Sequence, residues 1–147
     1  MLSVFVDGGG DKLGNCYYGI AWSRDNKLLF RYGAELPECK TNNEAEYEAI
    51  IAAFSITRLH LQGLATAIDA LDGREEITFY MDSELIVKQM LGEYQVRAIN
   101  LAERYEDARQ YLAALRELNA PHKIWLKHIP REQNEIADKT GREALGK

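Results

Sequence analysis

Cysteines, basic residues and long hydrophobic runs are all scarce in this sequence of 147 residues, and each scarcity excludes a class of protein. The two cysteines, Cys16 and Cys39, are too few for a disulfide-stapled scaffold and indicate reduced thiols in a cytoplasmic protein. The densest apolar run, residues 50–54, fits a core helix and is far shorter than a membrane span of about 20 residues, so we expect no membrane partner. The N-terminus has no basic leader, and we expect no signal peptide.

Positive charge is in short supply. The chain has 18 lysines and arginines against 23 aspartates and glutamates, which gives a net charge of −5. Such an acidic chain is not expected to hold nucleic acid by bulk electrostatics alone. It can do so where metal ions neutralise some of its carboxylates, so the positions of those carboxylates matter.

Several common site motifs are absent as well. The glycines of residues 8–14 do not form the G-x-G-x-x-G dinucleotide motif, and there is no Walker phosphate loop. Asp69 and Asp72 do not have EF-hand spacing, and the three histidines and two cysteines do not have zinc-binding spacing. A Ser-His-Asp catalytic site cannot be read from the sequence either.

The composition that is present, 46% hydrophobic and 28% charged, is typical of a globular protein, and the length favours a single domain over residues 1–147. Hydrophobic periodicity and turn residues predict an α/β fold with a mixed sheet flanked by helices. The glycines Gly8, Gly9 and Gly10 are interpreted as a turn, and Gly63 leaves the end of the first helix open. The predicted order is strands at 1–7, 16–23 and 27–36 in an antiparallel meander, a helix from about 44, a strand at 76–82, helices at 83–91 and 99–118, a strand at 122–128 and a helix at 132–145.

Two aspartates lie at the ends of predicted strands. Asp7 ends the first strand directly before the glycines, and Asp82 ends the fourth strand. An α/β sheet presents its functional edge at the carboxyl ends of such strands. We therefore expect both side chains near solvent, outside the core.

Two further carboxylates lie at or beside the apolar faces of predicted helices. Glu46 is on the same face as the alanines and isoleucine that follow it, and Asp138 is at the edge of the last helix's apolar arc. A carboxylate there is costly unless it is paired or bound to metal. Glu44, by contrast, shares its face with Glu48 and Ser55, which predicts a solvated surface. Spacing alone leaves open whether the four carboxylates form one site or are scattered structural charges.

Four motifs then occur in order along the chain: VDGG at 6–9, TNNEAEYEA at 41–49, MDSELIV at 81–87 and REQNEIAD at 131–138. Together they resemble the type 1 ribonuclease H family, over essentially the whole chain. The resemblance implies a five-stranded mixed sheet, with three antiparallel strands and then two parallel ones. It also implies that Asp7, Glu46, Asp82 and Asp138 are the catalytic and metal-binding residues and hold two Mg²⁺ ions, for which Mn²⁺ can substitute. The expected reaction is endonucleolytic cleavage of the RNA strand in RNA–DNA hybrids, leaving 5′-phosphate and 3′-hydroxyl ends.

The resemblance also suggests substrate contacts. Asn42 and Asn43 match positions that read ribose 2′-hydroxyls, and Thr41 matches a position near a DNA phosphate, although all three also suit helix capping. The further candidate substrate contacts are Asn15, Ser83, Asn134 and Arg131.

Three departures from the family pattern stand out. Glu84 replaces a common glutamine, and Arg131 lies where relatives have a loop histidine, with His128 inside the preceding strand. The segment 92–98 (GEYQVRA) lacks the tryptophan and all but one of the basic residues of the protrusion with which some relatives hold the hybrid. We therefore expect weak hybrid binding with a strong salt dependence.

Two alternative functions remain open from the sequence. One is a DNA-directed nuclease of the same fold, and the other is a non-catalytic module that binds hybrids. Double-stranded RNA stays open as a further substrate, and a monomer is the expected state.

Overall fold

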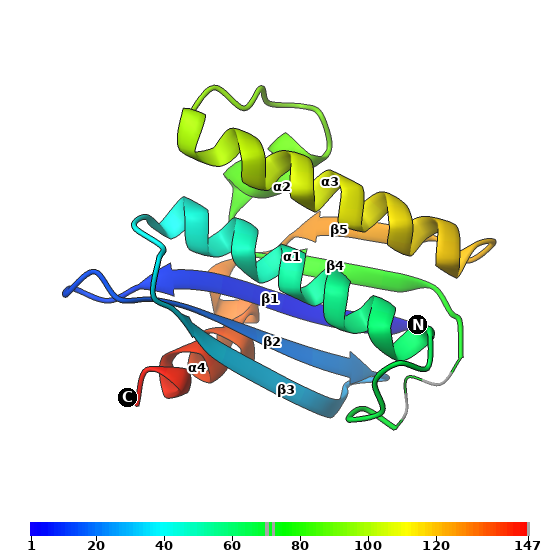
Figure 1. The fold of residues 1–147 in the computed structure, drawn as a ribbon. Coiled ribbons are helices and arrows are strands. Elements are labelled where there is room, and N and C mark those ends of the chain that lie inside the picture. The colour runs from blue at the N-terminus through cyan, green and yellow to red at the C-terminus, as the bar shows by residue number, and fades with distance from the viewer. Residues whose placement is uncertain (70, 72, 147) are drawn as a thin grey trace.

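A computed structural model describes residues 1–69, 71 and 73–146 and contains a five-stranded sheet in the order β3-β2-β1-β4-β5 (Figure 1). Three strands form an antiparallel meander, as predicted: β1 (Leu2–Gly10), β2 (Cys16–Arg24) and β3 (Lys27–Leu36). Two strands are parallel to β1 on its other side, namely β4 (Ile77–Met81) and β5 (Ile124–His128). The predicted mixed α/β sheet is confirmed.

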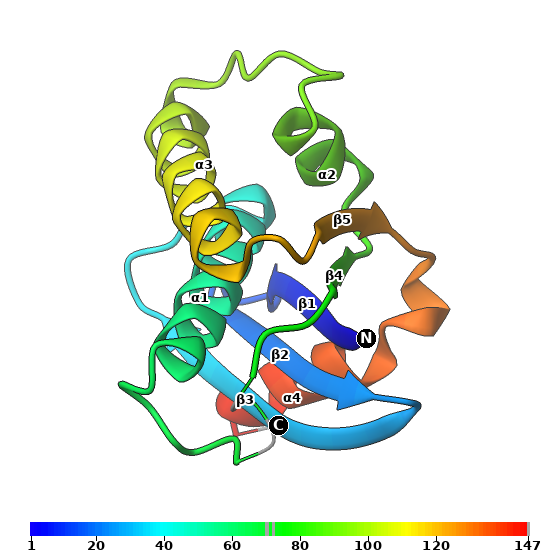
Figure 2. The same cartoon turned by 90° about the vertical axis from the view of Figure 1, so that its right-hand side faces the viewer.

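The helices form a layer on each face of this sheet. Figure 2 shows α1 (Asn42–Leu61) and α3 (Ile99–Asn119) on one face and α4 (Glu135–Ala144) on the other, behind β1 to β3. The short α2 (Glu84–Met90) follows β4, and a single 3₁₀ turn, η1 (Arg131–Gln133), precedes α4. No helix in the described part of the chain has the length and hydrophobicity needed to cross a membrane.

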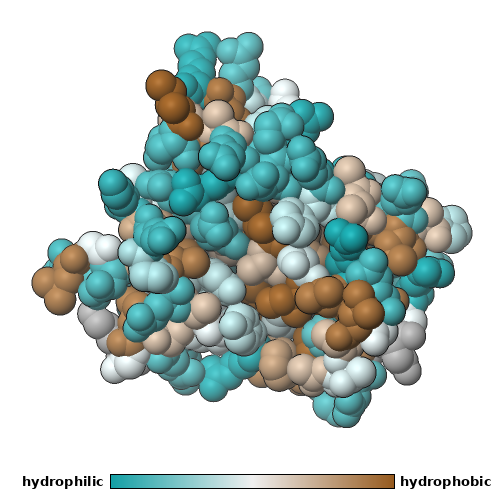
Figure 3. Space-filling view, viewed as in Figure 1, coloured by the Kyte–Doolittle hydropathy of each residue, from teal (hydrophilic) through white to brown (hydrophobic). Residues whose placement is uncertain are grey.

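The main hydrophobic core lies between the sheet and the α1–α3 layer. Alternate residues of β1 and β4 point into it, and from α1 it takes a tyrosine, two alanines, an isoleucine and a phenylalanine. Figure 3 shows a mostly hydrophilic outer surface over α3, with hydrophobic residues gathered around the C-terminal end of α1, where Leu59 and Leu64 are exposed. The core therefore fixes α1 against the centre of the sheet.

Two predictions at the first strand are wrong. Gly8, Gly9 and Gly10 do not turn but continue β1, opposite Tyr18, Tyr17 and Cys16, and the turn begins only at Asp11. As a result Asp7 lies within a strand and is only 8% exposed, not near solvent at a strand end. These glycines serve close packing, as the site makes clear.

Candidate active site

Asp7 and Asp82 are neighbours because β1 and β4 are parallel and adjacent. Val6 of β1 is in register with Met81 of β4, and the residue that follows each of them is an aspartate. Both aspartates therefore lie at the same end of the sheet. Asp82 is half-buried and lies just before α2. The register of these two parallel strands therefore brings the two aspartates close together.

Glu46 reaches the same edge because α1 begins directly over β1. A Cβ atom at Gly8 would lie 2.6 Å from the backbone nitrogen of Glu46, and closer still to the carbonyl of Ala45. Only glycine permits this approach of helix to strand. The first turn of α1 is capped by Thr41, whose hydroxyl accepts a 3.1 Å hydrogen bond from the backbone nitrogen of Glu44.

Asp138 arrives from the opposite face on α4. This helix lies directly on Gly19 of β2, where a Cβ atom would clash with the backbone of Ala137 and Gly141. The Asp138 carboxylate accepts hydrogen bonds from the Tyr17 hydroxyl at 3.5 Å and from Arg142 Nε at 3.2 Å. Gly19 opposes Asp7 in the β1–β2 ladder, so α4 is placed over the first aspartate.

The four carboxylates line one cavity of about 180 Å³. They come from four separate elements: β1, the start of α1, the end of β4 and α4. The remaining lining residues are the three glycines of β1 together with Tyr17, Asn42, Arg131 and Arg142. The structure therefore gathers all four sequence-predicted carboxylates, with one predicted asparagine and the predicted arginine, around a single polar hollow.

The gathered charges raise the affinity of the site for protons. The pKa of Asp7 is raised to about 9, first by burial and then by the charges of Asp82, Asp138 and Glu46. The pKa of Glu46 is raised to about 7, chiefly by burial; the charge of Asp82 contributes to this rise, while a hydrogen bond with Ser83 and the charge of Arg131 oppose it. Excess negative charge at a hollow favours a bound cation.

Asn134 is 1% exposed and fastens the 3₁₀ turn to the sheet edge, so the structure places this candidate substrate contact beneath the cavity surface. Its side-chain nitrogen donates to the Val6 carbonyl at 2.9 Å and to Asp82 Oδ2 at 3.4 Å. Ser83 caps α2 by accepting from the backbone nitrogen of Ile86. Asn134 thus contacts the Asp82 carboxylate, and Ser83 also forms a side-chain hydrogen bond with Glu46.

The other predicted substrate contacts are divided between the cavity rim and more distant positions. Thr41 and Asn42 are exposed and Asn43 is half-buried, all at the N-terminal end of α1, and Asn42 lines the cavity. Asn15 lies in the β1–β2 turn, where its side chain donates to Asp11 at 3.1 Å, and it does not line the cavity.

Sequence reasoning missed Tyr17 and Arg142. The spacing of Arg142, four residues after Asp138, was a readable signal for an ion pair on one helix face. Tyr17 had no such local signal, because only the β1–β2 register brings it to the cavity.

The solvated face predicted for Glu44 is wrong. Glu44 is 6% exposed, and its carboxylate pairs with Arg104 of α3 at 3.1 Å and accepts a hydrogen bond from the Thr41 hydroxyl at 3.0 Å. The α3 helix covers this face of α1, which no periodicity within α1 could reveal.

All-oxygen donors of this kind suit hard divalent cations such as Mg²⁺ and Mn²⁺. In the part of the chain that the structure describes, no three Asp, Glu, His or Cys side chains are placed so that they could already hold a metal ion. Asp138 is instead turned toward Arg142 and Tyr17. The donor set fits a metal, and the cavity lies between the donors.

Comparison with known proteins decides the family. Residues 19–144 match the family described as reverse transcriptase-like. The solved structure of LC11-RNase H1, in complex with an RNA/DNA hybrid, is 30% identical to this chain, covers 99% of it, is itself covered to 97%, and superposes with a TM-score of 0.79. This chain belongs to the type 1 ribonuclease H family. A second structure, RNase H1 of the halophilic archaeon Halobacterium salinarum, is 27% identical with a TM-score of 0.76 and covers 99% of this chain, which in turn covers 97% of it.

Among curated proteins, this chain is 28% identical to a bifunctional protein of Mycobacterium tuberculosis over 98% of its own length. The match spans only 36% of that protein's length. It is also 33% identical to the ribonuclease HI of Halobacterium salinarum, over 71% of this chain and 44% of that protein. The chain therefore spans less than half of the length of each of these two curated relatives.

Proposed function

We propose that this chain is a metal-dependent endoribonuclease that hydrolyses the RNA strand of RNA–DNA hybrids to 5′-phosphate and 3′-hydroxyl ends. The observation that carries the proposal is the convergence of Asp7, Glu46, Asp82 and Asp138 on one small cavity. Family membership and the hybrid bound to LC11-RNase H1 support the choice of substrate.

The four carboxylates would hold two divalent ions, Mg²⁺ or Mn²⁺. Bound there, the ions would supply positive charge to the attacking and leaving oxygens of the scissile phosphate. The raised pKa of Asp7 supports this assignment, because burial and the neighbouring carboxylates disfavour its charged form when no cation is bound.

The chain's own residues would orient the reacting groups. Asn134 holds the Asp82 carboxylate through its side-chain nitrogen, and Ser83 interacts with Glu46. Arg131 lies in η1 at the cavity, where its guanidinium would attract the scissile phosphate.

Recognition of RNA would come from the N-terminal end of α1. Asn42 is exposed at the cavity, and an amide can both donate to and accept from a ribose 2′-hydroxyl. Asn43 and Thr41 flank it, although Thr41 is also occupied in capping the helix.

We place the activity in the cytoplasm, which the two free cysteines support.

The test is cleavage of one labelled sequence presented as hybrid, duplex RNA, duplex DNA and single-stranded RNA, each with Mg²⁺, with Mn²⁺ or with excess chelator. We expect metal-dependent cutting confined mainly to the RNA of the hybrid. Equal cutting of duplex DNA would favour a DNA-directed nuclease. Hybrid binding without cutting under either metal would favour a non-catalytic module.

Matched variants test the residues. Asp82→Asn and Glu46→Gln should each abolish cleavage while the far-ultraviolet circular dichroism stays unchanged. Glu48→Gln, on the same helix but outside the cavity, should cleave as the wild type does. Wild-type turnover by Asp82→Asn would refute the metal assignment.

A further inference from the structure

The edge strand β5 carries a cationic and aromatic strip on its outward face. Lys123, directly before β5, and Trp125 and Lys127 within it alternate with Ile124 and Leu126, which are buried in the main core. Trp125 is 40% exposed, whereas the chain's other tryptophan, Trp22, is fully buried. We call Lys123, Trp125 and Lys127 the β5 strip.

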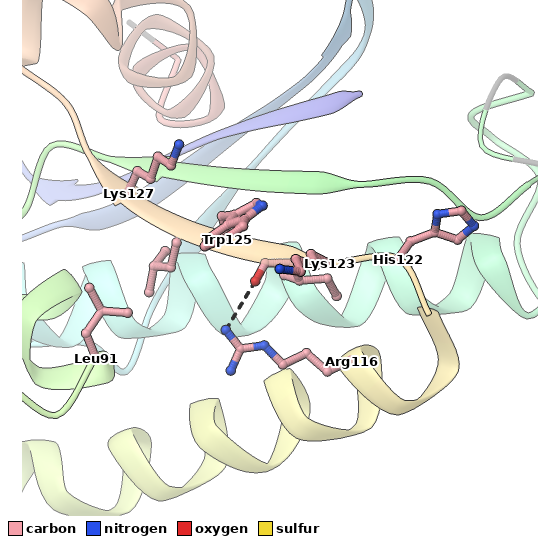
Figure 4. Close-up of a pocket in the computed structure, with 8 residues that line it drawn as sticks. Leu91, Arg116, His122, Lys123, Trp125 and Lys127 are labelled. Carbon is pink, nitrogen blue, oxygen red and sulfur yellow. Dashed lines mark hydrogen bonds between the residues drawn. The ribbon is translucent and has the colours of Figure 1, made fainter. Parts of the chain in front are cut away.

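The strip is held together by its own contacts. The ammonium groups of Lys123 and Lys127 lie 5.5 and 5.7 Å from the centre of the Trp125 ring system. Beside it, Arg116 of α3 donates to the Ile124 carbonyl at 3.2 Å, as Figure 4 shows. Together with His122 these residues line an open groove of about 580 Å³.

Positive charge on the strip is available to a partner. Among residues 1–69, 71 and 73–146, neither lysine of the strip nor Arg116 forms an ion pair with a carboxylate. This is a local cationic surface on a chain whose net charge is −5. Lysines on an edge strand can merely block sheet-to-sheet pairing, but an exposed tryptophan between them works against that purpose.

The strip is also continuous with the active edge of the sheet. Lys127 is in register with Tyr80, and Asp82 follows Met81 at the end of the same β4 strand. The α4 helix packs on β1, β2 and β3, which leaves the outward face of β5 without a helix (Figure 2). Of the three residues of the strip, Lys127 lies nearest to the end of the sheet that carries Asp82.

We propose that the β5 strip binds single-stranded nucleic acid extending from the hybrid, with a base stacked on Trp125 and phosphates at Lys123 and Lys127. The proposal rests on the proposed hybrid-cleaving function. Alternation of cations and an aromatic ring is what sequence-tolerant single-strand binding requires. The backbone positions of the two lysines are about 13 Å apart, and their flexible side chains would leave the Trp125 ring to a stacked base and move to the phosphates on either side of it.

The first test measures binding without cleavage. The wild-type chain in chelator is titrated at low salt with a short oligothymidylate while tryptophan emission is recorded. Trp22 is buried and donates to Thr57, so quenching would report Trp125. We expect saturable quenching with the oligonucleotide. Absence of quenching and of binding at low salt would overturn the proposal.

Variants assign the contacts, with affinity measured by anisotropy of a labelled oligothymidylate. Trp125→Ala should weaken binding about tenfold. Lys123→Gln with Lys127→Gln should lower the slope of log affinity against log salt by about 1.4. The charge-preserving Lys123→Arg with Lys127→Arg should restore it. Lys27→Gln with Arg109→Gln removes two cations elsewhere and should leave binding unchanged; equal loss in this control would overturn the proposal.

The activity of the strip variants separates this proposal from the proposed function. A blunt hybrid should be cleaved equally by the wild type and Trp125→Ala, whereas a hybrid with a single-stranded extension should show a raised KM only in the variant. Identical KM values of the wild type and Trp125→Ala for the extended hybrid would overturn the proposal for the β5 strip and leave the proposed nuclease function standing. Quenching by an acidic peptide but not by oligothymidylate would likewise overturn it, in favour of a protein partner.

Discussion

Two helices bring a carboxylate to one cavity from opposite faces of the sheet, and they are anchored very differently. The α1 helix, which carries Glu46, has 20 residues and contributes Tyr47, Ile50 and Phe54 to the core with no exposed surface. The α4 helix, which carries Asp138, has 10 residues and buries only Ala137, Thr140 and Gly141. The position of Glu46 is thus tied to the stability of the whole fold. That of Asp138 depends on close contacts of α4 with Gly19 and Gly33 and on hydrogen bonds from two side chains.

The largest expected effect comes from adding a methyl group beneath each helix. Gly8→Ala would push against the backbone of α1 and should cost about 3 kcal/mol of unfolding free energy. Gly19→Ala would displace the peripheral α4 and should cost only about 1–2 kcal/mol. Both variants should lose most of their cleavage activity, because each moves a carboxylate.

Urea unfolding of the two variants, alongside cleavage assays, measures this difference. Gly73→Ala is the matched control, since a Cβ atom there meets no neighbour within 4 Å. Equal losses of unfolding free energy for Gly8→Ala and Gly19→Ala would mean that both carboxylates are tied to the core to the same degree.

The same comparison explains what the sequence could predict. Elements were readable because strand alternation and helix caps are local signals, and the motifs carried the four carboxylates. The role of Gly8 to Gly10 was not readable, because a glycine run looks the same in a turn and under a packed helix. The burial of Glu44 and the approach of Tyr17 depend on partners far away in the sequence, Arg104 and Asp138.

Glu44 provides a second, buried anchor for α1, whereas the ion pair that joins α4 to the sheet, Glu143 with Arg31, is exposed. Glu44→Gln removes the charge paired with Arg104 in a buried setting and should lower the unfolding free energy by about 1–2 kcal/mol. Cleavage should persist, because Glu44 does not line the cavity. Glu46→Gln should show the reverse, with cleavage lost and no loss of stability. An inactive but stable Glu44→Gln would exchange the roles of the two glutamates.

Asp7 lies between α1 and α4, and its ionisation changes the free energy of unfolding of the chain. Its pKa in the folded chain is raised from 3.8 to about 9, so between these values the folded state keeps a proton that the unfolded state releases. In chelator the unfolding free energy should therefore fall as the pH rises through this window. Asp7→Asn should remove the part of that slope that is due to Asp7, leaving the smaller fall up to about pH 7 that the raised pKa of Glu46 contributes, and should be about 1–2 kcal/mol more stable than the wild type at pH 8.

Urea titrations at pH 5 and pH 8 in chelator check this prediction. Mg²⁺ added at pH 8 should stabilise the wild type and leave Asp7→Asn nearly unchanged. Parallel pH profiles for the two proteins would show that Asp7 ionises normally in the folded state.

The smallest effect concerns Arg142, whose side chain, and not the core, contacts Asp138. Arg142 Nε lies 3.1 Å from Asp138 Oδ2, on an exposed turn of α4, so Arg142→Gln should change the unfolding free energy by less than about 0.5 kcal/mol. At the proposed metal site this cation would compete with a metal ion for the Asp138 carboxylate. Its removal should lower the half-saturating Mg²⁺ concentration for cleavage about two- to threefold, which corresponds to roughly 0.5 kcal/mol. Lys139→Gln removes a neighbouring charge that does not contact Asp138 and should leave the Mg²⁺ requirement unchanged. A higher Mg²⁺ requirement in Arg142→Gln would mean that Arg142 instead holds Asp138 in its metal-binding orientation. The position of Asp138 would then be fixed by a side-chain contact as firmly as the position of Glu46 is fixed by core packing.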